Sequence, residues 1–323
     1  LTPGDMVVDI GSNDGTLLSF FKERGMRVLG IEPAEKIAKS AMASGIESWP
    51  VFFDEKVADK VASYARVQNA AVKLVVANNV FAHADDLIGI ARAVKLLLRP
   101  EGMFVFEVSY LPDMIRGTLF DLCYHEHLSY HAVSPLIPMF ASLGMSLVDA
   151  KRVNTHGGSI RVTVSAEKDF PPEASVSSIC LEELEMGLTP GCGDVTRATF
   201  ATLQQTIHER RDELLRVLHG ARMAGKRIAA YGAPAKATTL LHTFGLAEGT
   251  FDFVVDDSPH KQGRYLPGTD IPVVPFEAVA DRKPDMVVVL AWNFAESILA
   301  KLTPFMEAGG MCVVPLSHVV QHG

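Results

Sequence analysis

The sequence predicts an α/β protein with two open, largely parallel sheets joined by a helical connector. Three observations lead to this fold class. Short apolar runs alternate with helical stretches in the first half of the chain, a charged helical region follows, and a second alternating series begins at Arg227. Because a strand, a helix and a further strand in succession pack as a parallel sheet covered by helices, each series should form its own sheet.

Four continuously apolar runs in the first half predict strands that are buried on both faces, at 6–10, 27–32, 73–77 and 103–108. Between and after them, apolar residues at helical spacing predict helices at 16–24, 34–44, 85–98 and 135–143. Two later runs, 146–153 and 159–165, should pair as a hairpin that closes this sheet.

The connector should run from 171 to 225 and contain one long helix over 196–224. Its acidic run 182–185 is expected to be a solvated helix face. Strands of the second series are expected at 227–231, 251–255, 271–274, 286–290 and 311–314. The predicted domains are therefore residues 1–170, 171–225 and 226–323.

The amino-acid composition disfavours a nucleic-acid-binding, a membrane-spanning or a disulfide-rich protein. The 30 Lys and Arg against 38 Asp and Glu leave a net charge of −8, so no overall positive field would attract nucleic acid or an anionic membrane. The four cysteines show no CxxC spacing, which predicts neither a disulfide framework nor a metal site and suits a reducing cytoplasm. No apolar run approaches the ~20 residues that span a bilayer. We expect a cytoplasmic protein with a small-molecule substrate; its oligomeric state is left open.

The first strand runs into a glycine-containing turn, 11–15, that opens a helix, and there the backbone can approach a ligand closely. Its spacing, DxGxxxG from Asp9, differs from the GxGxxG of dinucleotide sites, which disfavours NAD. The pattern is typical of class I methyltransferases that use S-adenosylmethionine. Glu32 ends the next strand, where a carboxylate can accept the ribose hydroxyls. The alternative is a plain strand-to-helix turn. The predicted cofactor-binding residues are Asp9, Gly11, Ser12, Asn13, Gly15, Glu32, Pro33, Asn78 and Asn79.

A second motif, YHEHLSYH at 124–131, concentrates three imidazoles, a carboxylate and two phenols in eight positions. A HExxH zinc helix would need histidine at position 129, which is Ser129. His127 and His131 share a helical spacing, but no third metal ligand is apparent, so no metal site is predicted. The alternative to a catalytic role is a polar surface turn.

Four segments together resemble the sugar C-methyltransferases of deoxysugar biosynthesis, which act on nucleotide-linked keto-sugars: DIGSNDG, FDLCYHEHLSYH, YGAPAKA and VVDDSPHKQGRYLPGTDIPV. The resemblance covers essentially the whole chain and fits the C-3 type. It implies a class I methyltransferase domain with a Rossmann-like fold, a helical connector and a second Rossmann-like domain. Such enzymes usually carry an N-terminal zinc-binding module rich in CxxC pairs. This sequence has none, and its first strand starts close to Leu1, which suggests an upstream segment; zinc is expected only there.

The resemblance also implies roles for residues of the second motif. His127 would be the base, Glu126 would orient its imidazolium, and Tyr124 and His83 would donate hydrogen bonds to a developing enolate oxygen. Chemistry agrees, because methylation at carbon needs a carbanion equivalent and an imidazole can remove a proton next to a ketone near neutral pH. Methyl transfer in line would leave S-adenosylhomocysteine.

Two other regions are candidate substrate contacts. Ser159 and Arg161 follow a glycine pair, which a plain hairpin turn would also explain. Tyr231, Lys236 and Asp256 lie at strand ends of the second series, where they could hold a nucleotide diphosphate across a cleft between the domains; an ordinary helix start is the alternative. The predicted function is C-methylation of a nucleotide-diphosphate-linked keto-deoxysugar. The alternatives are an O- or N-methyltransferase of a small molecule and a non-catalytic module that binds nucleotide sugar or S-adenosylmethionine.

Overall fold

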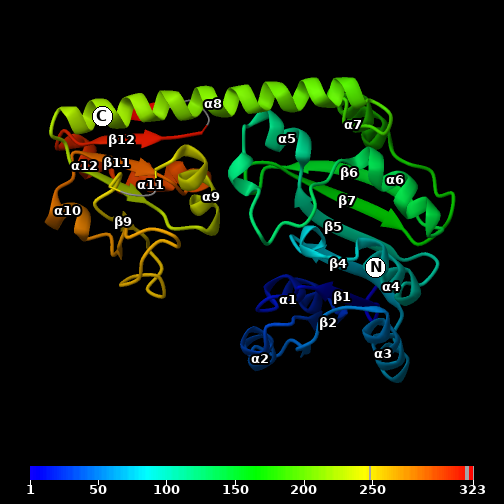
Figure 1. The fold of residues 1–323 in the computed structure, drawn as a ribbon. Coiled ribbons are helices and arrows are strands. Elements are labelled where there is room, and N and C mark those ends of the chain that lie inside the picture. The colour runs from blue at the N-terminus through cyan, green and yellow to red at the C-terminus, as the bar shows by residue number, and fades with distance from the viewer. Residues whose placement is uncertain (247–248, 317–319, 323) are drawn as a thin grey trace. The chain divides into compact units, whose positions relative to one another are not determined.

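The computed structural model describes residues 1–246, 249–316 and 320–322 and confirms the predicted α/β fold (Figure 1). The chain forms two compact units. The first contains Leu1–Pro112 and Glu126–Thr196, and the second contains Asp113–His125 and Arg197–Gly323. Each unit thus combines two stretches of chain, an arrangement that the linear division at residues 170 and 225 did not include.

The first unit is built on a seven-stranded sheet with the strand order β3-β2-β1-β4-β5-β7-β6. Its strands are β1 (Met6–Ile10), β2 (Arg27–Ile31), β3 (Ser48–Trp49), β4 (Val72–Asn78), β5 (Met103–Ser109), β6 (Ser146–Val153) and β7 (Ser159–Ser165). The first five are parallel, and β6 and β7 form the predicted antiparallel hairpin beside β5. The carboxyl ends of β1, β2, β4 and β5 therefore meet at one edge.

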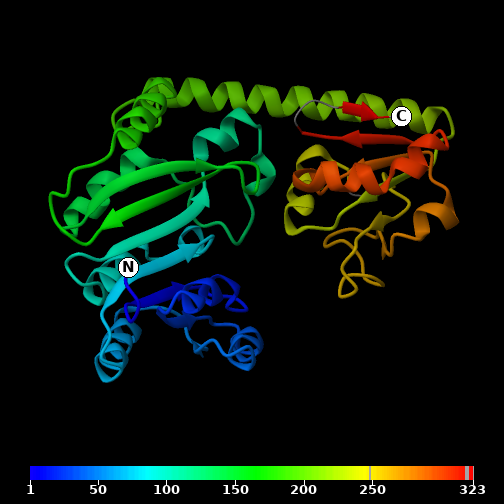
Figure 2. The same ribbon diagram turned by 180° about the vertical axis from the view of Figure 1, so that it is seen from behind.

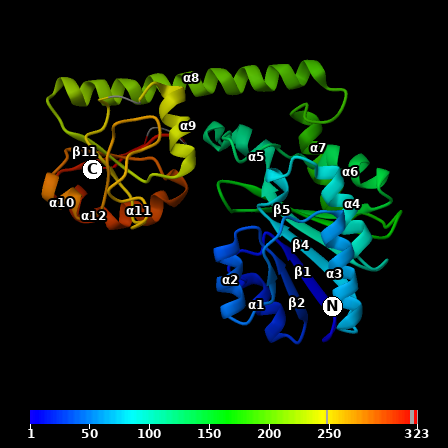
Figure 3. The same ribbon diagram turned by 60° about the horizontal axis from the view of Figure 1, so that its bottom comes forward.

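Alternating strand residues face helices on the two sides of this sheet. Val7 packs with α1 (Thr16–Glu23) and α2 (Glu35–Ala43), whereas Val8 packs with α3 (Glu55–Val67) and α4 (Leu87–Leu97). Figure 3 shows these two helix pairs on opposite sides of the strands. Helix α3 was not among the predicted elements. Its signals were Asp54, whose carboxylate caps the N–H of Val57 (2.7 Å), and buried residues at helical spacing.

Five further elements lie in the first unit or in the segment that links it to the second: η1 (Phe81–His83), α5 (Leu111–Arg116), η2 (Phe120–Leu122), α6 (Val133–Ser142) and α7 (Ala174–Glu185). The prediction of a solvated face at 182–185 is wrong for Glu183, whose side chain is 0% exposed. Its carboxylate accepts hydrogen bonds from the N–H groups of Val133 (2.6 Å) and Ser134 (2.7 Å), from the Ser134 hydroxyl and from the Tyr110 hydroxyl (2.9 Å). Glu183 of α7 thereby caps the N-terminus of α6, which has no side-chain cap of its own.

The second unit contains a six-stranded sheet in the order β10-β9-β8-β11-β12-β13. The strands are β8 (Ile228–Tyr231), β9 (Val254–Val255), β10 (Val273–Val274), β11 (Met286–Val289), β12 (Met311–Val314) and β13 (Val320–His322). All are parallel except β13, which runs antiparallel to β12. Strand order reverses between β8 and β11, and the crevice at the carboxyl edge of such a reversal is where open α/β sheets bind ligands.

Helices cover both faces of this second sheet (Figure 2). The C-terminal half of α8 (Gly193–Met223) and α9 (Ala235–Phe244) pack on one face. On the other face lie α10 (Ala278–Arg282), α11 (Ala295–Lys301) and α12 (Thr303–Glu307), with η3 (Trp292–Phe294) after β11. In the described part of the chain no helix combines the length and the apolar surface needed to cross a membrane.

The segment Asp113–His125 belongs to the second unit because its apolar residues pack there. The ring of Phe120 in η2 lies 5.2 Å from the ring of Phe244 in α9, measured between centroids. The hydroxyl of Thr239 donates to the carbonyl of Cys123 (3.5 Å). The first half of the second motif is therefore anchored on α9.

We predict that Glu183→Gln destabilises the first unit by about 2 kcal/mol or more, because an amide nitrogen would face N–H donors that now have a carboxylate acceptor. The thermal unfolding midpoint should fall by several degrees. The matched control is Glu185→Gln in the same helix, where the side chain is exposed; it should change stability by less than about 0.5 kcal/mol. Equal midpoints for the two variants would contradict the capping role.

Candidate active site

The glycine turn after β1 needs backbone conformations that favour glycine. Gly11 has φ 72° and Gly15 has φ 82°, both in the left-handed region. A Cβ on Gly11 would lie 2.3 Å from Cγ2 of Val80, so the turn passes directly against the segment that follows β4. The N–H of Gly11 also donates to the carbonyl of Ile31 in β2 (2.7 Å). These contacts bring the ends of three strands together.

Glu32 holds this turn to the end of β2. Its Oε2 accepts from the N–H of Asn13 (3.0 Å), and its Oε1 accepts from the N–H of Ala34 (2.9 Å). Asp9 is buried nearby in β1, and its burial, followed by the charge of Glu32, raises the pKa of the Asp9 carboxyl to about 7. Two carboxyl groups therefore lie close together at the carboxyl edge of the sheet.

Some of the other predicted cofactor residues are buried and others are exposed to solvent. Ser12 is buried, and its hydroxyl lies so close to Gly30 that a Cβ there would be 2.3 Å away. Asn13, Pro33 and Asn78 are exposed. Asn79 adopts φ 55° and donates its N–H to the carbonyl of Glu107 (2.7 Å).

This donor set fits S-adenosylmethionine. Its ribose diol needs an acceptor such as the Glu32 carboxylate, and the positive-φ turn lets the backbone approach its amino-acid end closely. Asn78 adds an exposed amide at the end of the neighbouring strand β4. The structure thus gathers these residues at one sheet edge, although Ser12 faces the interior.

Two imidazoles lie side by side next to this turn. The ring of His127 is 5.2 Å from that of His83, between centroids. The carbonyl of Ala82 accepts from the N–H of Leu128 (3.0 Å) and of Ser129 (3.3 Å), which holds the two segments together. His83 follows Val80, the residue that contacts Gly11, by three positions in η1. His83 is exposed and His127 is half-buried, so both rings can meet a ligand.

His131 has a different environment. It is 4% exposed, its ring stacks on Phe81 at 5.7 Å, and its Nε2 lies 3.0 Å from the Ser129 hydroxyl. Burial lowers the pKa of His131 to about 4, so the imidazole is neutral at physiological pH. Among the residues that the structure describes, no group of three or more His, Cys, Asp or Glu could hold a metal ion.

The remaining residues of the second motif straddle the division between the units. Tyr124 is half-buried and belongs to the second unit, and its N–H donates to the carbonyl of Leu122 (3.1 Å). Glu126 is exposed and begins the return of the chain to the first unit. The motif therefore contains residues of both units, because the chain passes from the second unit to the first between His125 and Glu126.

Ser159 and Arg161 are engaged in the hairpin. Ser159 is fully buried, and its hydroxyl donates to the carbonyl of Thr155 (3.1 Å), so in this structure it holds the turn. Arg161 is half-exposed and donates to Oε2 of Glu107 through Nε (3.2 Å) and Nη2 (2.9 Å). Glu107 also accepts from Thr155 (2.7 Å). Sequence reasoning missed Glu107; its signal was a carboxylate within the apolar strand MFVFEVS.

In the second unit the predicted substrate residues are paired within the protein. Asp256 accepts from the N–H groups of Ala233 (2.7 Å) and Ser258 (2.9 Å) and from Lys261 Nζ (3.2 Å). The Tyr231 hydroxyl donates to Asp257 (2.9 Å), and burial, reinforced by Asp257, raises its pKa to about 12. These contacts fix the two loops at the carboxyl ends of β8 and β9.

Lys236 is only 7% exposed, and its ammonium lies 3.6 Å above the centre of the Trp292 ring. Burial lowers the pKa of Lys236 to about 8. The indole N–H of Trp292 donates to Oδ2 of Asp121 (2.6 Å), which is fully buried and whose pKa is raised by burial. Sequence reasoning missed Asp121 and Trp292 as partners, although an acidic residue between Phe120 and Leu122 was a signal.

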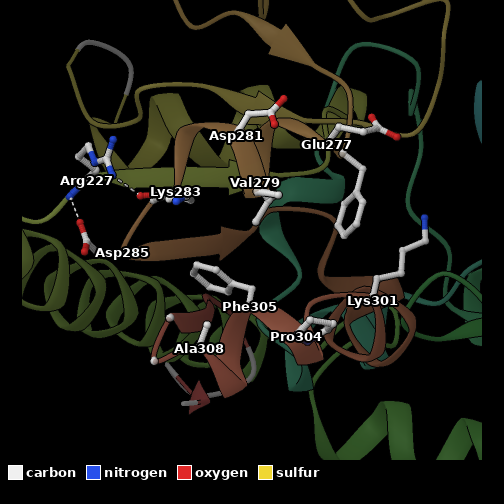
Figure 4. Close-up of a pocket in the computed structure, with 15 residues that line it drawn as sticks. Arg227, Glu277, Val279, Asp281, Lys283, Asp285, Lys301, Pro304, Phe305 and Ala308 are labelled. Carbon is white, nitrogen blue, oxygen red and sulfur yellow. Dashed lines mark hydrogen bonds between the residues drawn. The ribbon is translucent and has the colours of Figure 1, made fainter.

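A cavity of about 900 Å³ lies at the opposite edge of the second sheet. Figure 4 shows the residues that line it. Arg227, Asp285 and Gly310, which line it, precede β8, β11 and β12. The carboxylate of Asp285 accepts a hydrogen bond from the backbone N–H of Arg227 (2.8 Å). Because open α/β sheets bind ligands at their carboxyl ends, this cavity is not the candidate site.

Sequence comparisons match both parts of the chain to methyltransferase family models. Residues 2–150 match a family model described as a methyltransferase domain, and residues 154–317 match one described as a C-methyltransferase C-terminal domain. The C-methyltransferase NovU of Streptomyces niveus is 35% identical over 317 residues, which cover 98% of this chain and 73% of NovU.

Two solved structures are similar to about half of the chain. One is a complex of the Haloferax volcanii Trm112 methyltransferase activator with a putative methyltransferase, at 15% identity and a TM-score of 0.41 over 52% of this chain and 84% of that one. The other is a putative S-adenosylmethionine-dependent methyltransferase from Listeria monocytogenes, at 13% identity and a TM-score of 0.39 over 50% and 91%.

We predict that Asp9→Asn stabilises the protein more at pH 8 than at pH 5, measured as the change in thermal unfolding midpoint against the unmodified chain. The native pKa of about 7 lies above the ordinary value of 3.8, so native Asp9 keeps a proton that the unfolded chain releases. Native stability is therefore lost as the pH rises through this window. Asp14→Asn, an exposed carboxylate of the same turn, should give no such gain at pH 8. A pH-independent difference for Asp9→Asn would refute the shift.

Proposed function

Since this chain belongs to the C-methyltransferase family, we propose that it methylates a carbon next to the carbonyl of a nucleotide-diphosphate-linked keto-deoxysugar. It is an S-adenosylmethionine-dependent C-methyltransferase. The observation that carries the proposal is the pair of imidazoles, His83 and His127, held together beside the glycine turn.

Methylation at carbon differs from methylation at oxygen or nitrogen in needing a base that breaks a C–H bond. Oxygen and nitrogen already carry lone pairs, whereas carbon must first become an enolate. When bound, S-adenosylmethionine supplies an electrophilic methyl group on a positively charged sulfur. Family membership favours the carbon acceptor over the O- and N-methylation alternatives.

His127 is the proposed base. It is half-buried, and an imidazole titrates close enough to neutral pH to accept the proton that leaves the carbon next to the ketone. The electron pair of that C–H bond becomes the enolate, which forms the new carbon–carbon bond to the methyl group. Glu126, the adjacent carboxylate, stabilises the imidazolium electrostatically.

His83 and Tyr124 are proposed to donate hydrogen bonds to the developing enolate oxygen. The geometry that supports His83 is its 5.2 Å ring separation from His127, which allows the two rings to address neighbouring atoms of one substrate. Tyr124 precedes His127 by three residues on the same segment. Such donors lower the barrier because they bind the oxyanion more strongly than the ketone.

The cofactor would be held at the carboxyl edge of the first sheet. Glu32 is the proposed acceptor for the ribose hydroxyls, with Asp9 beside it, and the turn from Gly11 to Gly15 is proposed to face the amino-acid end. Asn78 and Asn79 close the site from β4. Exposure of Asn13 and Asn78 supports this placement, and S-adenosylhomocysteine would remain as product.

The nucleotide of the substrate is proposed to bind the second unit at the strand reversal between β8 and β11. The loops that carry Tyr231, Lys236 and Asp256 lie at this edge. In the enzyme type that the sequence resembles, the methylated position is C-3 of the sugar.

We predict that His127→Asn lowers the rate of methyl transfer and the rate at which substrate hydrogen exchanges with deuterated solvent, each by about 10²–10⁴-fold. The measurement is mass spectrometry on a panel of nucleoside-diphosphate keto-deoxysugars, with and without S-adenosylmethionine. Calorimetry should show unchanged S-adenosylmethionine binding, which demonstrates a folded first unit.

His125→Asn is the matched control, because it removes an exposed imidazole two residues away and should leave hydrogen exchange intact. Retained exchange in His127→Asn would show that another group is the base. Methylation of an oxygen or nitrogen atom in the product would reject the enolate route itself.

A further inference from the structure

We propose that Glu107 is a positioning residue, which holds the guanidinium of Arg161 in place to bind oxygen atoms of the acceptor sugar. This inference rests on the proposed function, because it assumes that the acceptor is a sugar. It gives a role to a buried carboxylate that neither the proposed cofactor contacts nor the proposed base uses.

Glu107 belongs to a row of polar residues that crosses the first sheet at the last residue of β4. Asn78 pairs with Glu107 of β5, and Glu107 pairs with Arg161 of β7. Residues that pair directly across a sheet share one face, so these side chains leave it on the same side. Asp9 shares that side, because it pairs with Val76, two residues before Asn78. The row therefore extends from the proposed cofactor edge to β7 (Figure 1).

The face that carries this row is less covered than the opposite face. Val105 and Thr163 pair with each other on it and are half-buried. Phe106 and Val162, which pair on the opposite face, are fully buried in the core of the first unit. The side chain of Arg161 is 51% exposed, so a ligand can reach its guanidinium.

The carboxylate of Glu107 is buried, and both of its oxygens accept hydrogen bonds. Oε2 accepts from Nε (3.2 Å) and Nη2 (2.9 Å) of Arg161, and Oε1 accepts from the Thr155 hydroxyl (2.7 Å). Two bonds from the guanidinium to one oxygen fix the orientation of its plane, which a long side chain would otherwise vary. The N–H groups of Nη1 lie outside this pair, so Arg161 keeps donors for a ligand.

Strand β5 connects this pair to the segments of the proposed site. The carbonyl of Glu107 accepts from the N–H of Asn79 (2.7 Å), and the next residue, Val80, lies against the glycine turn. Just beyond β5, Leu111 donates its N–H to the carbonyl of His131 at the end of the second motif (2.9 Å). The strand that holds Arg161 in place is therefore attached to the cofactor turn and to the motif that carries the proposed base.

The charge balance of the pair favours a neutral ligand. The Glu107 carboxylate offsets the guanidinium charge, and Lys151, which lies opposite Arg161 on β6, is paired with Asp149 (3.0 Å). A phosphate would find little net positive charge here, whereas the carbonyl and hydroxyl oxygens of a sugar need only N–H donors. Because these donors belong to one rigid plane, they would orient the sugar as well as bind it.

The first test separates the sugar from the nucleotide by calorimetric titration of the full chain. The ligands are TDP-glucose and UDP-glucose, each compared with its nucleoside diphosphate. In the unmodified chain the glucose should add affinity to the diphosphate that binds better. Arg161→Lys keeps the charge but loses the planar fork, so it should weaken binding of the nucleotide sugar about tenfold. Its affinity for the nucleoside diphosphate should change by less than about twofold.

Lys151→Gln is the matched control. It removes a cation directly opposite Arg161 on the same face, and it should change either affinity by less than about twofold. Thermal unfolding midpoints show that each variant is folded at the temperature of the titration.

A double variant tests the positioning role of Glu107. Glu107→Gln should weaken binding of the nucleotide sugar about fivefold, and in the methylation assay it should raise KM more than it lowers kcat. When it is added to Arg161→Lys it should cause no further loss, because it acts through the guanidinium. A merely structural role would instead add its own loss. If Glu107→Gln does not fold, Glu107→Asp, which keeps the charge but withdraws the acceptor, takes its place in the same cycle.

A sugar that adds no affinity in the unmodified chain would overturn the inference, and so would additive losses in the double variant. A loss of S-adenosylmethionine affinity in folded Arg161→Lys would overturn it too, since the guanidinium would then serve the cofactor. In each case methyl transfer by the unmodified chain would still proceed. Absence of methyl transfer together with a sugar affinity that depends on Arg161 would instead reject the proposed function.

Discussion

Backbone N–H groups that leave a strand or begin a helix need acceptors, and buried carboxylates provide them throughout this protein. Glu32 accepts the N–H groups of Asn13 and Ala34, Glu183 accepts those of Val133 and Ser134, and Asp256 accepts those of Ala233 and Ser258. Each carboxylate ties two segments that are separated in sequence. The loops at the strand ends are ordered because leaving these donors unpaired would cost more than burying the charge.

Burial then divides the titratable groups between structural and chemical roles. His131 is buried and neutral, whereas His127, four residues earlier, and His83 in η1 remain open to a ligand. The buried ring of His131 stacks on Phe81 of η1, and this contact helps to hold His127 beside η1. A reactive ring needs such support, since a displacement of about 1 Å can cost a large part of the catalytic rate.

In the second unit an aromatic ring lies between a carboxylate and an ammonium group. Asp121 and Lys236 are buried on either side of Trp292, whose indole donates to the carboxylate and lies against the ammonium. Asp121 comes from the stretch between β5 and α6, so the second unit depends on residues located within the sequence of the first. A segment that began at Arg197 would therefore lack part of the core of the second unit.

The sequence by itself determined the α/β class, most of the strands and the glycine turn, because apolar periodicity and glycine spacing are local properties that survive in one dimension. The resemblance of its motifs to those of the sugar C-methyltransferases also marked His83 and His127 as candidates. Only the tertiary structure decided that Glu183 is buried, that Ser159 serves a turn, and that Asp121 meets Trp292 across 171 positions. These outcomes depend on which donors and rings folding brings within a few ångströms of one another, and a contact between distant residues leaves no periodic trace in the chain.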